Sequence, residues 1–202
     1  GNCLVPYEYH IHPVELSDIE ILNWGELTDK IRKISFYDDE NSPILDALLR
    51  KRRKLVEQAE NKIDVFREAF LKNNFKTLKY TLVYASDKER KQLQEVNSFI
   101  KDECKLMFHQ ITSEETSNGI SEQILKDFSE GSSLQVLTAM RVLDEGVNIP
   151  QISIAYLLAS TTVKRQWTQR RGRVLRKCSE INKEKAIIHD FVVVAPHFDE
   201  FK

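Results

Sequence analysis

The spacing of apolar residues predicts different elements in the first third of the chain and in the remainder. Residues 4–16 alternate polar and apolar side chains, which favours a strand, and Pro13 restricts this strand to the edge of a sheet. Helical spacing then predicts an amphipathic helix over about 18–34 and one long helix over 43–70. We therefore expect residues 1–75 to form a connector or appendage of one extended strand and two helices.

From Leu78 onward, short apolar strands alternate with amphipathic helices. These strands lack the polar alternation of a half-exposed sheet, which indicates that both of their faces are covered. The pattern predicts an α/β domain over residues 76–202 with a mainly parallel sheet between helices, where ligands bind at the carboxyl ends of the strands. The expected strands cover residues 81–84, 104–111, 134–139, 153–158 and 186–194.

Capping residues mark the expected helix boundaries. Ser17–Glu20 and Ser86–Glu89 both match the capping box, in which the first and fourth side chains bond to each other's backbone N–H. Pro43 fits the first turn of the long helix, because a backbone N–H at that position has no helical partner. Gly131 ends the helix that precedes the third strand of the α/β domain.

The composition is that of a globular chain with a sizeable core, since 41% of its 202 residues are hydrophobic. Acidic and basic residues nearly cancel to a net charge of -1, so nucleic-acid binding requires a local basic cluster. The three cysteines follow no zinc or disulfide spacing, and we expect a reducing, cytoplasmic environment and no metal site. No apolar run approaches the roughly 18 residues of a membrane span. The start at Gly1, within an extended segment, suggests a piece of a longer protein.

Two polar clusters in the first third each allow two interpretations. His10 and His12 share one face of the expected strand, where they are either solvated or part of a metal site whose further ligands are not evident nearby. The basic run Arg50–Lys54 lies on the long helix and either faces solvent or contacts a nucleic-acid backbone. We favour the solvated interpretation for both clusters.

A basic motif, QRRGRVLR at residues 169–176, follows the fourth strand of the α/β domain. Arginine stays charged and presents a planar fork of donors, so Arg173 and Arg176, three residues apart, can grip one phosphate chain from one helical face. Gly172 allows the backbone to pass close to a ligand. Composition alone also allows a solvated basic helix.

A second motif, at residues 141–150, follows the third strand and places Gly146 and Asn148 in a turn. This segment is either an ordinary loop before the next strand or a nucleotide contact. The second interpretation rests on the close backbone approach that glycine permits and on the hydrogen bonds that asparagine forms with sugar hydroxyls. Both motifs directly follow carboxyl strand ends.

The order of motifs resembles that of a known family. The chain contains YAS at 84–86, ITSEET at 111–116, LTAMRVLDEGVNIP at 137–150 and QWTQRRGRVLR at 166–176. In this order and spacing they resemble the second RecA-like domain of superfamily 2 helicases. The resemblance is closest to the branch of type I and type III restriction-enzyme motor subunits and related repair helicases. It covers roughly residues 76–195 and implies a three-layer RecA-like fold.

The resemblance assigns roles in ATP hydrolysis to the two motifs. Arg173 and Arg176 are implied to be arginine fingers that reach the γ-phosphate of an ATP held on the first domain. Gln169 is implied to contact the phosphate or the attacking water. The other implied nucleotide contacts are Glu145, Gly146, Asn148, Arg170 and Gly172, of which Asn148 stands where the family usually has an aspartate.

The resemblance also implies nucleic-acid contacts at three hydroxyl residues. Thr112 falls where the family places a hydroxyl against the nucleic-acid backbone, and the same role is implied for Ser86 and Thr138. The family branch makes DNA the expected partner, with RNA as the alternative.

The chain lacks the other half of a nucleotide site. It contains neither a GxxxxGK[ST] loop nor a DEAD-like acidic box, which together hold the phosphates and Mg²⁺ of ATP. We therefore expect ATP with Mg²⁺ to be bound mainly by a RecA-like domain upstream of Gly1, and the isolated chain to be inactive. The interpretation is a C-terminal motor domain of an ATP-dependent DNA helicase or translocase. The alternative is a non-catalytic RecA-like module that binds nucleic acid or a protein.

Overall fold

The computed structural model describes most of the chain. The described residues are 4–37, 42–86, 90–117, 119, 121–140, 149–159, 172, 174–194 and 196. Among the helices in these ranges, none has the length and hydropathy needed to span a membrane.

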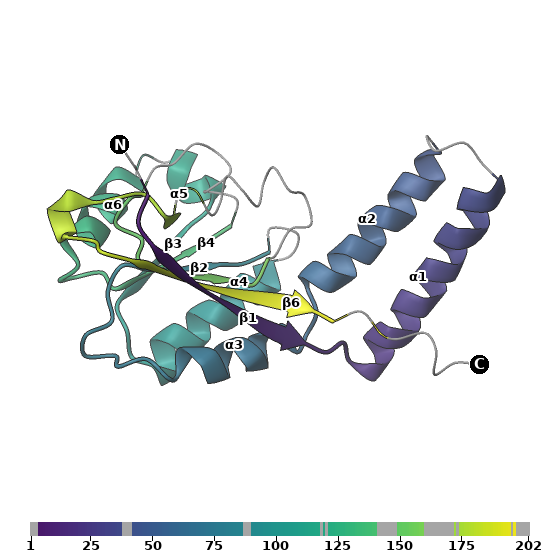
Figure 1. The fold of residues 1–202 in the computed structure, drawn as a ribbon, viewed down its shortest axis with the longest axis horizontal. Helices are drawn as coiled ribbons and strands as arrows, with labels where there is room; N and C mark the ends of the chain where they lie inside the picture. Colours follow the sequence, from purple (N-terminus) through teal and green to yellow (C-terminus); the bar gives the residue numbers. More distant parts are fainter. Residues whose placement is uncertain are drawn as a thin grey trace.

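Six parallel strands form one sheet at the centre of the main body (Figure 1). Every neighbouring pair is parallel, so all the strands end at the same side of the sheet, which we call the carboxyl edge, and begin at the opposite amino edge. This arrangement confirms the expected α/β fold with a parallel sheet. In sheet order the strands are β1 (Tyr7–Val14), β6 (Ala186–Val193), β5 (Ile154–Leu157), β2 (Thr81–Tyr84), β4 (Val136–Ala139) and β3 (Phe108–Ile111).

Helices cover both faces of the sheet, and two more project from it (Figure 1). α3 and α4 lie on one face, and α6 lies on the other. The helices are α1 (Asp18–Tyr37), α2 (Pro43–Glu57), α3 (Lys62–Phe70), α4 (Arg90–Ser98), α5 (Ser113–Ser117) and α6 (Ser121–Glu130), with a π-helical turn at Phe99–Glu103 and a 3-10 turn at Ser179–Ile181.

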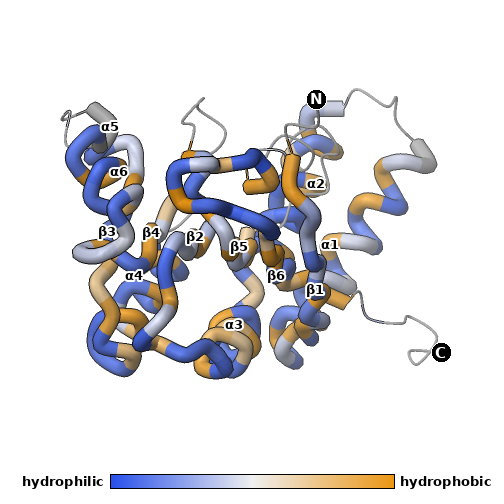
Figure 2. Tube along the Cα trace, turned by 60° about the vertical axis from the view of Figure 1, so that its left-hand side comes forward, coloured by the Kyte–Doolittle hydropathy of each residue, from blue (hydrophilic) through white to orange (hydrophobic). Residues whose placement is uncertain are grey.

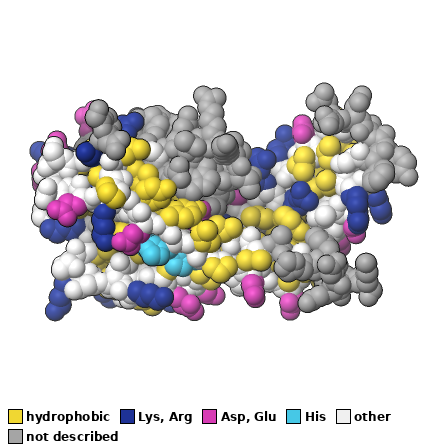
Figure 3. All heavy atoms as spheres, viewed as in Figure 1, with side chains coloured by type: hydrophobic (Ala, Val, Ile, Leu, Met, Phe, Trp, Pro, Cys, Tyr) yellow, Lys and Arg dark blue, Asp and Glu magenta, His cyan; other side chains and the backbone are white. Residues whose placement is uncertain are grey.

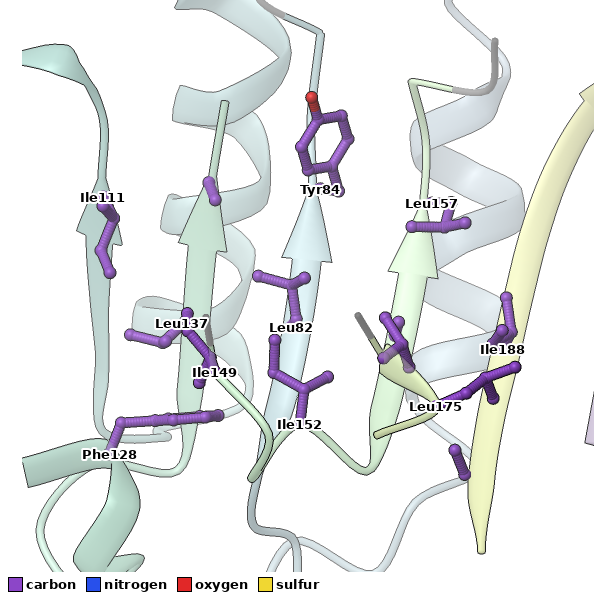
Figure 4. Close-up of a cluster of buried hydrophobic side chains, with 14 of the residues drawn as sticks. Leu82, Tyr84, Ile111, Phe128, Leu137, Ile149, Ile152, Leu157, Leu175 and Ile188 are labelled. Carbon is purple, nitrogen blue, oxygen red and sulfur yellow. The ribbon is translucent and has the colours of Figure 1, made fainter. Parts of the chain in front are cut away.

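Two apolar cores, one on each face, hold these three layers together. On the face covered by α3 and α4, the ring of Phe66 meets that of Tyr156 edge-on, with centroids 5.6 Å apart. On the opposite face, Phe128 of α6 packs with Leu137 (Figure 4). Val83 lies in the first core while its neighbours in β2 lie in the second, as the pleat of a strand requires. Figure 2 shows hydrophobic positions both on the strands and on the helices that cover them. The sheet and the two cores confirm the three-layer RecA-like expectation.

The first 75 residues contribute directly to this sheet. β1 is an edge strand and pairs with β6 from Tyr7 to Val14, which agrees with the restriction that Pro13 places on it. Val14, Phe66 and Phe70 belong to the same apolar core as residues of β2 and β4. Residues 1–75 and 76–202 thus share one sheet, and the expected division at residue 75 stays a prediction.

α1 and α2 pack against each other and form a helical hairpin that projects beyond the carboxyl edge (Figure 1). Its base is fixed by the expected capping box, because Ser17 N–H donates to Glu20 Oε2 at 3.0 Å and Glu20 N–H donates to Ser17 Oγ at 3.5 Å. Glu20 Oε1 also accepts a bond from Glu60 N–H at 2.9 Å, and Asn61 Nδ2 donates to the Glu15 carbonyl at 2.9 Å. These bonds join the hairpin to the start of α3.

The single long helix expected over 43–70 was wrong, because it is interrupted at residues 58–61 between α2 and α3. α2 packs on α1, whereas α3 packs on the sheet. The apolar spacing that continues through residues 43–70 in the sequence is therefore divided between two helices with different packing partners. The strand expected over 104–111 is also shorter, since the π-helical turn and a left-handed Lys105 (φ 55°) precede it.

Candidate functional site

The expected site residues divide into those that the structure describes and those that lie outside the described residues. Outside lie Gln169, Arg170, Arg173, Glu145, Gly146 and Asn148. The described ones are Ser86, Thr112, Thr138, Gly172 and Arg176.

Ser86, Thr112 and Thr138 come from the carboxyl ends of three neighbouring strands, β2, β3 and β4. Ser86 follows β2 by two residues, Thr112 follows β3 directly, and Thr138 is the last residue but one of β4. The parallel register therefore brings all three to the carboxyl edge. Their hydroxyl contacts with nucleic acid stay predictions.

Thr112 caps the short helix α5. Its N–H donates to Glu115 Oε2 at 2.8 Å, its hydroxyl donates to the same carboxylate, and Glu114 N–H donates to Thr112 Oγ1 at 3.3 Å. Burial alone raises the pKa of Glu115, but the bonds donated by Thr112 and Gln110 outweigh burial and lower the pKa to about 2. The hydroxyl of Thr112 is thus bonded inside the protein, and only 3% of the residue is exposed to solvent.

Thr138 is fully buried and bonded to α4. Its hydroxyl donates to Asn97 Oδ1 at 2.7 Å, and Asn97 Nδ2 donates to Gln110 Oε1 at 3.1 Å. Gln110 Nε2 in turn donates to Glu115 Oε1 at 2.8 Å. A polar network therefore links α4, β4, β3 and α5 and ends at the cap of Thr112.

Ser86 is buried at the end of β2, where its N–H donates to Gln92 Oε1 at 2.8 Å. Gln92 Nε2 donates to the carbonyl of Glu57 at 3.3 Å. Gln92 therefore joins the carboxyl end of β2 to the last residue of α2, at the foot of the hairpin.

Sequence reasoning missed the amide and carboxylate residues that build this edge. One signal was available for Glu115, because Thr112 to Glu115 repeats the capping-box spacing. Asn97, Gln92 and Gln110 carry no comparable signal, since their partners lie on other elements.

Leu175 and Arg176, at the end of the 169–176 motif, lie near the amino edge. Val5 N–H donates to the Leu175 carbonyl at 2.8 Å, and Arg176 forms an isolated antiparallel bridge with Leu4. Figure 4 shows Leu175 beside Ile188 near the start of β6. Arg176 is exposed there, and a Cβ added at Gly172 meets no atom within 4 Å. The close approach of a ligand to Gly172 stays a prediction.

Lys183 ties the described ends of both motifs together. Its ammonium donates to the carbonyls of Pro150 at 3.0 Å and Val174 at 2.6 Å, and to that of Ile152. Burial lowers the pKa of Lys183 to about 8. The amine therefore holds the segment that follows residues 141–148 against the end of the 169–176 motif.

A second buried lysine, Lys62 of α3, lies at the carboxyl edge. It is fully buried, and its Nζ donates to the Leu158 carbonyl at 2.5 Å, directly after β5. Burial lowers the pKa of Lys62 to about 8, against the opposing effects of Asp190 and Glu57. Asp190 accepts a hydrogen bond from the hydroxyl of Tyr9, so this carboxylate joins β6 to β1.

The described residues do not gather metal ligands. Within the described ranges no three His, Cys, Asp or Glu side chains are placed to hold a metal ion.

Comparison with known proteins defines the family. Residues 61–178, more than half of the chain, match the model of the helicase conserved C-terminal domain. A 56-residue stretch is 43% identical to the DNA 3'-5' translocase XPB2 of Sulfurisphaera tokodaii, and it covers 28% of this chain but only 12% of that translocase.

Solved structures share the fold. The C-terminal part of the Fun30 ATPase domain matches with a TM-score of 0.65 at 13% identity, over 94% of this chain and 85% of that one. The Sulfolobus solfataricus SWI2/SNF2 ATPase core, solved in complex with dsDNA, matches with a TM-score of 0.66 at 11% identity, over 93% of this chain and 41% of that one. The chain belongs to the helicase C-terminal domain family, and the expected superfamily 2 assignment is confirmed.

Proposed function

We propose that this chain is the C-terminal motor domain of an ATP-dependent DNA helicase or translocase. The observation that carries the proposal is the family match over 61–178. In sequence, the two charged motifs follow strands β4 and β5. The identity to a DNA translocase, although limited to 56 residues, supports translocation on DNA as the activity of the whole protein.

In this proposal the 169–176 motif acts on a nucleotide held mainly by a second RecA-like domain. ATP with Mg²⁺ supplies the phosphoryl group that is transferred to water. Arg173 and Arg176 donate to the phosphate oxygens and stabilise the charge that develops there, while Gln169 orients the phosphate or the water. Arg170 and Gly172 support this loop, and Glu145, Gly146 and Asn148 contact the nucleotide from the neighbouring strand end.

In this proposal the carboxyl edge faces the nucleic acid. Ser86 and Thr112 follow strand ends, and a phosphate bound there would displace the bonds of their N–H groups to Gln92 and Glu115. The network from Thr138 to Glu115 fixes the position of Thr112. Closure of the cleft between the two domains and its reopening after hydrolysis then shift the grip along the strand.

Steady-state ATPase measurements on the intact protein test the arginine roles. Arg173→Ala and Arg176→Ala should each lower kcat by roughly 10³-fold or more, because each removes a cation from the reacting phosphate. DNA affinity, measured without nucleotide, should change little. Lys177→Ala is the matched control, since Lys177 is an exposed neighbouring cation.

The isolated chain completes the test. It should release no phosphate above background with or without DNA, since it lacks the phosphate loop and the acidic box. DNA-stimulated turnover by the isolated chain, or an unchanged kcat in both arginine variants, would contradict the proposal.

A further inference from the structure

The hairpin of α1 and α2 carries a basic flank that the motor motifs do not use. The flank consists of Arg50, Lys51, Arg53 and Lys54 on α2. Arg50, Lys51 and Arg53 are exposed, and Lys54 is half-buried. At about 100° per residue, these four positions fan out over one side of the helix.

The remaining cation of the run points the other way. Arg52 lies over the ring of Trp24 on α1, with its guanidinium carbon 5.0 Å from the ring centroid. Its Nη1 also donates to the hydroxyl of Thr28 at 3.3 Å. Arg52 therefore joins the two helices, and this contact fixes which side of α2 the other four cations occupy.

No carboxylate in the described part of the chain neutralises the exposed residues of the flank. Arg50, Lys51 and Arg53 form no ion pair with any described residue, whereas on α1 Arg32 pairs with Asp29 and Lys30 lies 4.0 Å from Glu26. The flank is thus a local positive cluster on a protein whose net charge is -1.

The position of the flank relates it to the carboxyl edge. The hairpin stands beyond this edge, and Figure 3 shows Lys and Arg side chains along the side of the hairpin that is turned toward the main body. Because α2 buries no residue and ends beside Gln92, its cations are presented next to the strand ends without being needed by the core.

We propose that the basic flank binds the phosphate backbone of a DNA duplex that also runs along the carboxyl edge. The inference rests on the proposed function, and charge complementarity selects the partner. α2, PILDALLRKRRKLVE, contains no aromatic residue on which an unpaired base could stack, so the flank reads phosphates and not bases. Binding is therefore independent of sequence and strongly dependent on salt.

Fluorescence anisotropy of the full 202-residue chain with a labelled DNA duplex tests this inference. The variant R50Q/K51Q/R53Q removes three exposed charges and keeps good helix formers in α2. The plot of log affinity against log salt should lose about 2.7 units of slope, or 0.9 per phosphate contact. Affinity at low salt should fall about tenfold or more.

The matched control is K72Q/K76Q/K79Q, which removes the same charge from exposed residues in the loop before β2. It should keep the slope and affinity of the parent. Both variants should unfold at the parent's temperature, because every substituted side chain is exposed. An unchanged slope in the flank variant, or an equal loss in the control, overturns the inference.

Two outcomes separate this inference from the proposed function. If the parent chain does not bind the duplex even at low salt, both the inference and DNA as partner fail. In the intact protein, the flank variant should raise the DNA concentration that gives half-maximal ATPase stimulation, whereas Arg173→Ala lowers turnover at saturating DNA. A flank variant with the parent's DNA requirement would leave the motor function standing and remove the inference alone.

Discussion

His189 of β6 lies between the rings of Tyr156 and His12 on the face of the sheet covered by α3. Its ring stacks on Tyr156 with centroids 4.5 Å apart, and its Nδ1 lies 2.8 Å from Nε2 of His12. Burial, followed by the charges of His12 and His10, lowers the pKa of His189 from 6.5 to about 4. Burial likewise lowers the pKa of His12. The folded protein therefore keeps His189 and His12 neutral at pH values at which both are protonated in the unfolded chain.

This difference predicts a loss of stability on acidification. Between pH 6.5 and about 4, His189 is protonated in the unfolded chain but not in the folded protein. The free energy of unfolding therefore falls as pH decreases through this window. His189→Gln should flatten this part of the curve, measured by urea unfolding at a series of pH values. His109→Gln, at an exposed position of β3, should keep it. The prediction fails if the His189 variant retains the full slope.

At the scale of elements, short apolar runs were sufficient to predict β2, β4 and β5, and also β6, although His189 and Asp190 interrupt its run. Local signals also predicted the Ser17–Glu20 capping box, which the hydrogen bonds confirm. They could not predict the break between α2 and α3, because an apolar stripe does not reveal which partner it packs against. Lys62 and Lys183 were missed for a related reason. A lysine in sequence is ordinarily solvated, and only the fold brings carbonyls within reach of these amines.

The end of α6 gives a test of how an element is terminated. Gly131 has φ +68°, and a Cβ there would lie 2.8 Å from the hydroxyl oxygen of Tyr80. Gly119 has nearly the same φ, +69°, but a Cβ there meets nothing within 4 Å. Gly119→Ala should therefore cost only the left-handed strain, about 1–2 kcal/mol of unfolding free energy.

Gly131→Ala should cost about 1 kcal/mol more than Gly119→Ala, because overpacking adds to the strain. The ring of Tyr80 meets Phe128 edge-on with centroids 6.1 Å apart, so it cannot move aside without losing that contact. Urea unfolding of the two variants measures the difference. Equal losses of unfolding free energy in the two variants would show that the Tyr80 ring moves aside without cost.

At the scale of the whole molecule, the sheet is completed by residues far from it in sequence. β1 covers the open side of β6, and α3 supplies Phe66 and Phe70 to the core that β2 and β4 share. The sequence predicted the strand β1 and the helical residues of α3. It did not predict that β1 joins the main sheet or that α3 packs on it, because strand order depends on pairings that local patterns do not encode.

A fragment of residues 76–202 tests the expected domain division. Removing β1 and α3 takes away the buried side chains of Val14, Phe66 and Phe70. The core residues that pack against these side chains become exposed, and β6 becomes an open edge strand. We expect this fragment to lose the cooperative thermal transition of the full chain, measured by circular dichroism. A sharp transition in the fragment would instead establish 76–202 as an independent folding unit.

The attachment of the hairpin has a mechanical consequence. α1 has 20 residues and is therefore about 30 Å long, and the bonds between Glu20 and Glu60 and between Asn61 and Glu15 hold its base at the start of α3. An arm of this length magnifies rotation. A turn of about 6° at its base would displace its far end by about 3 Å, so small rotations of the domain become ångström-scale movements at the tip of the hairpin.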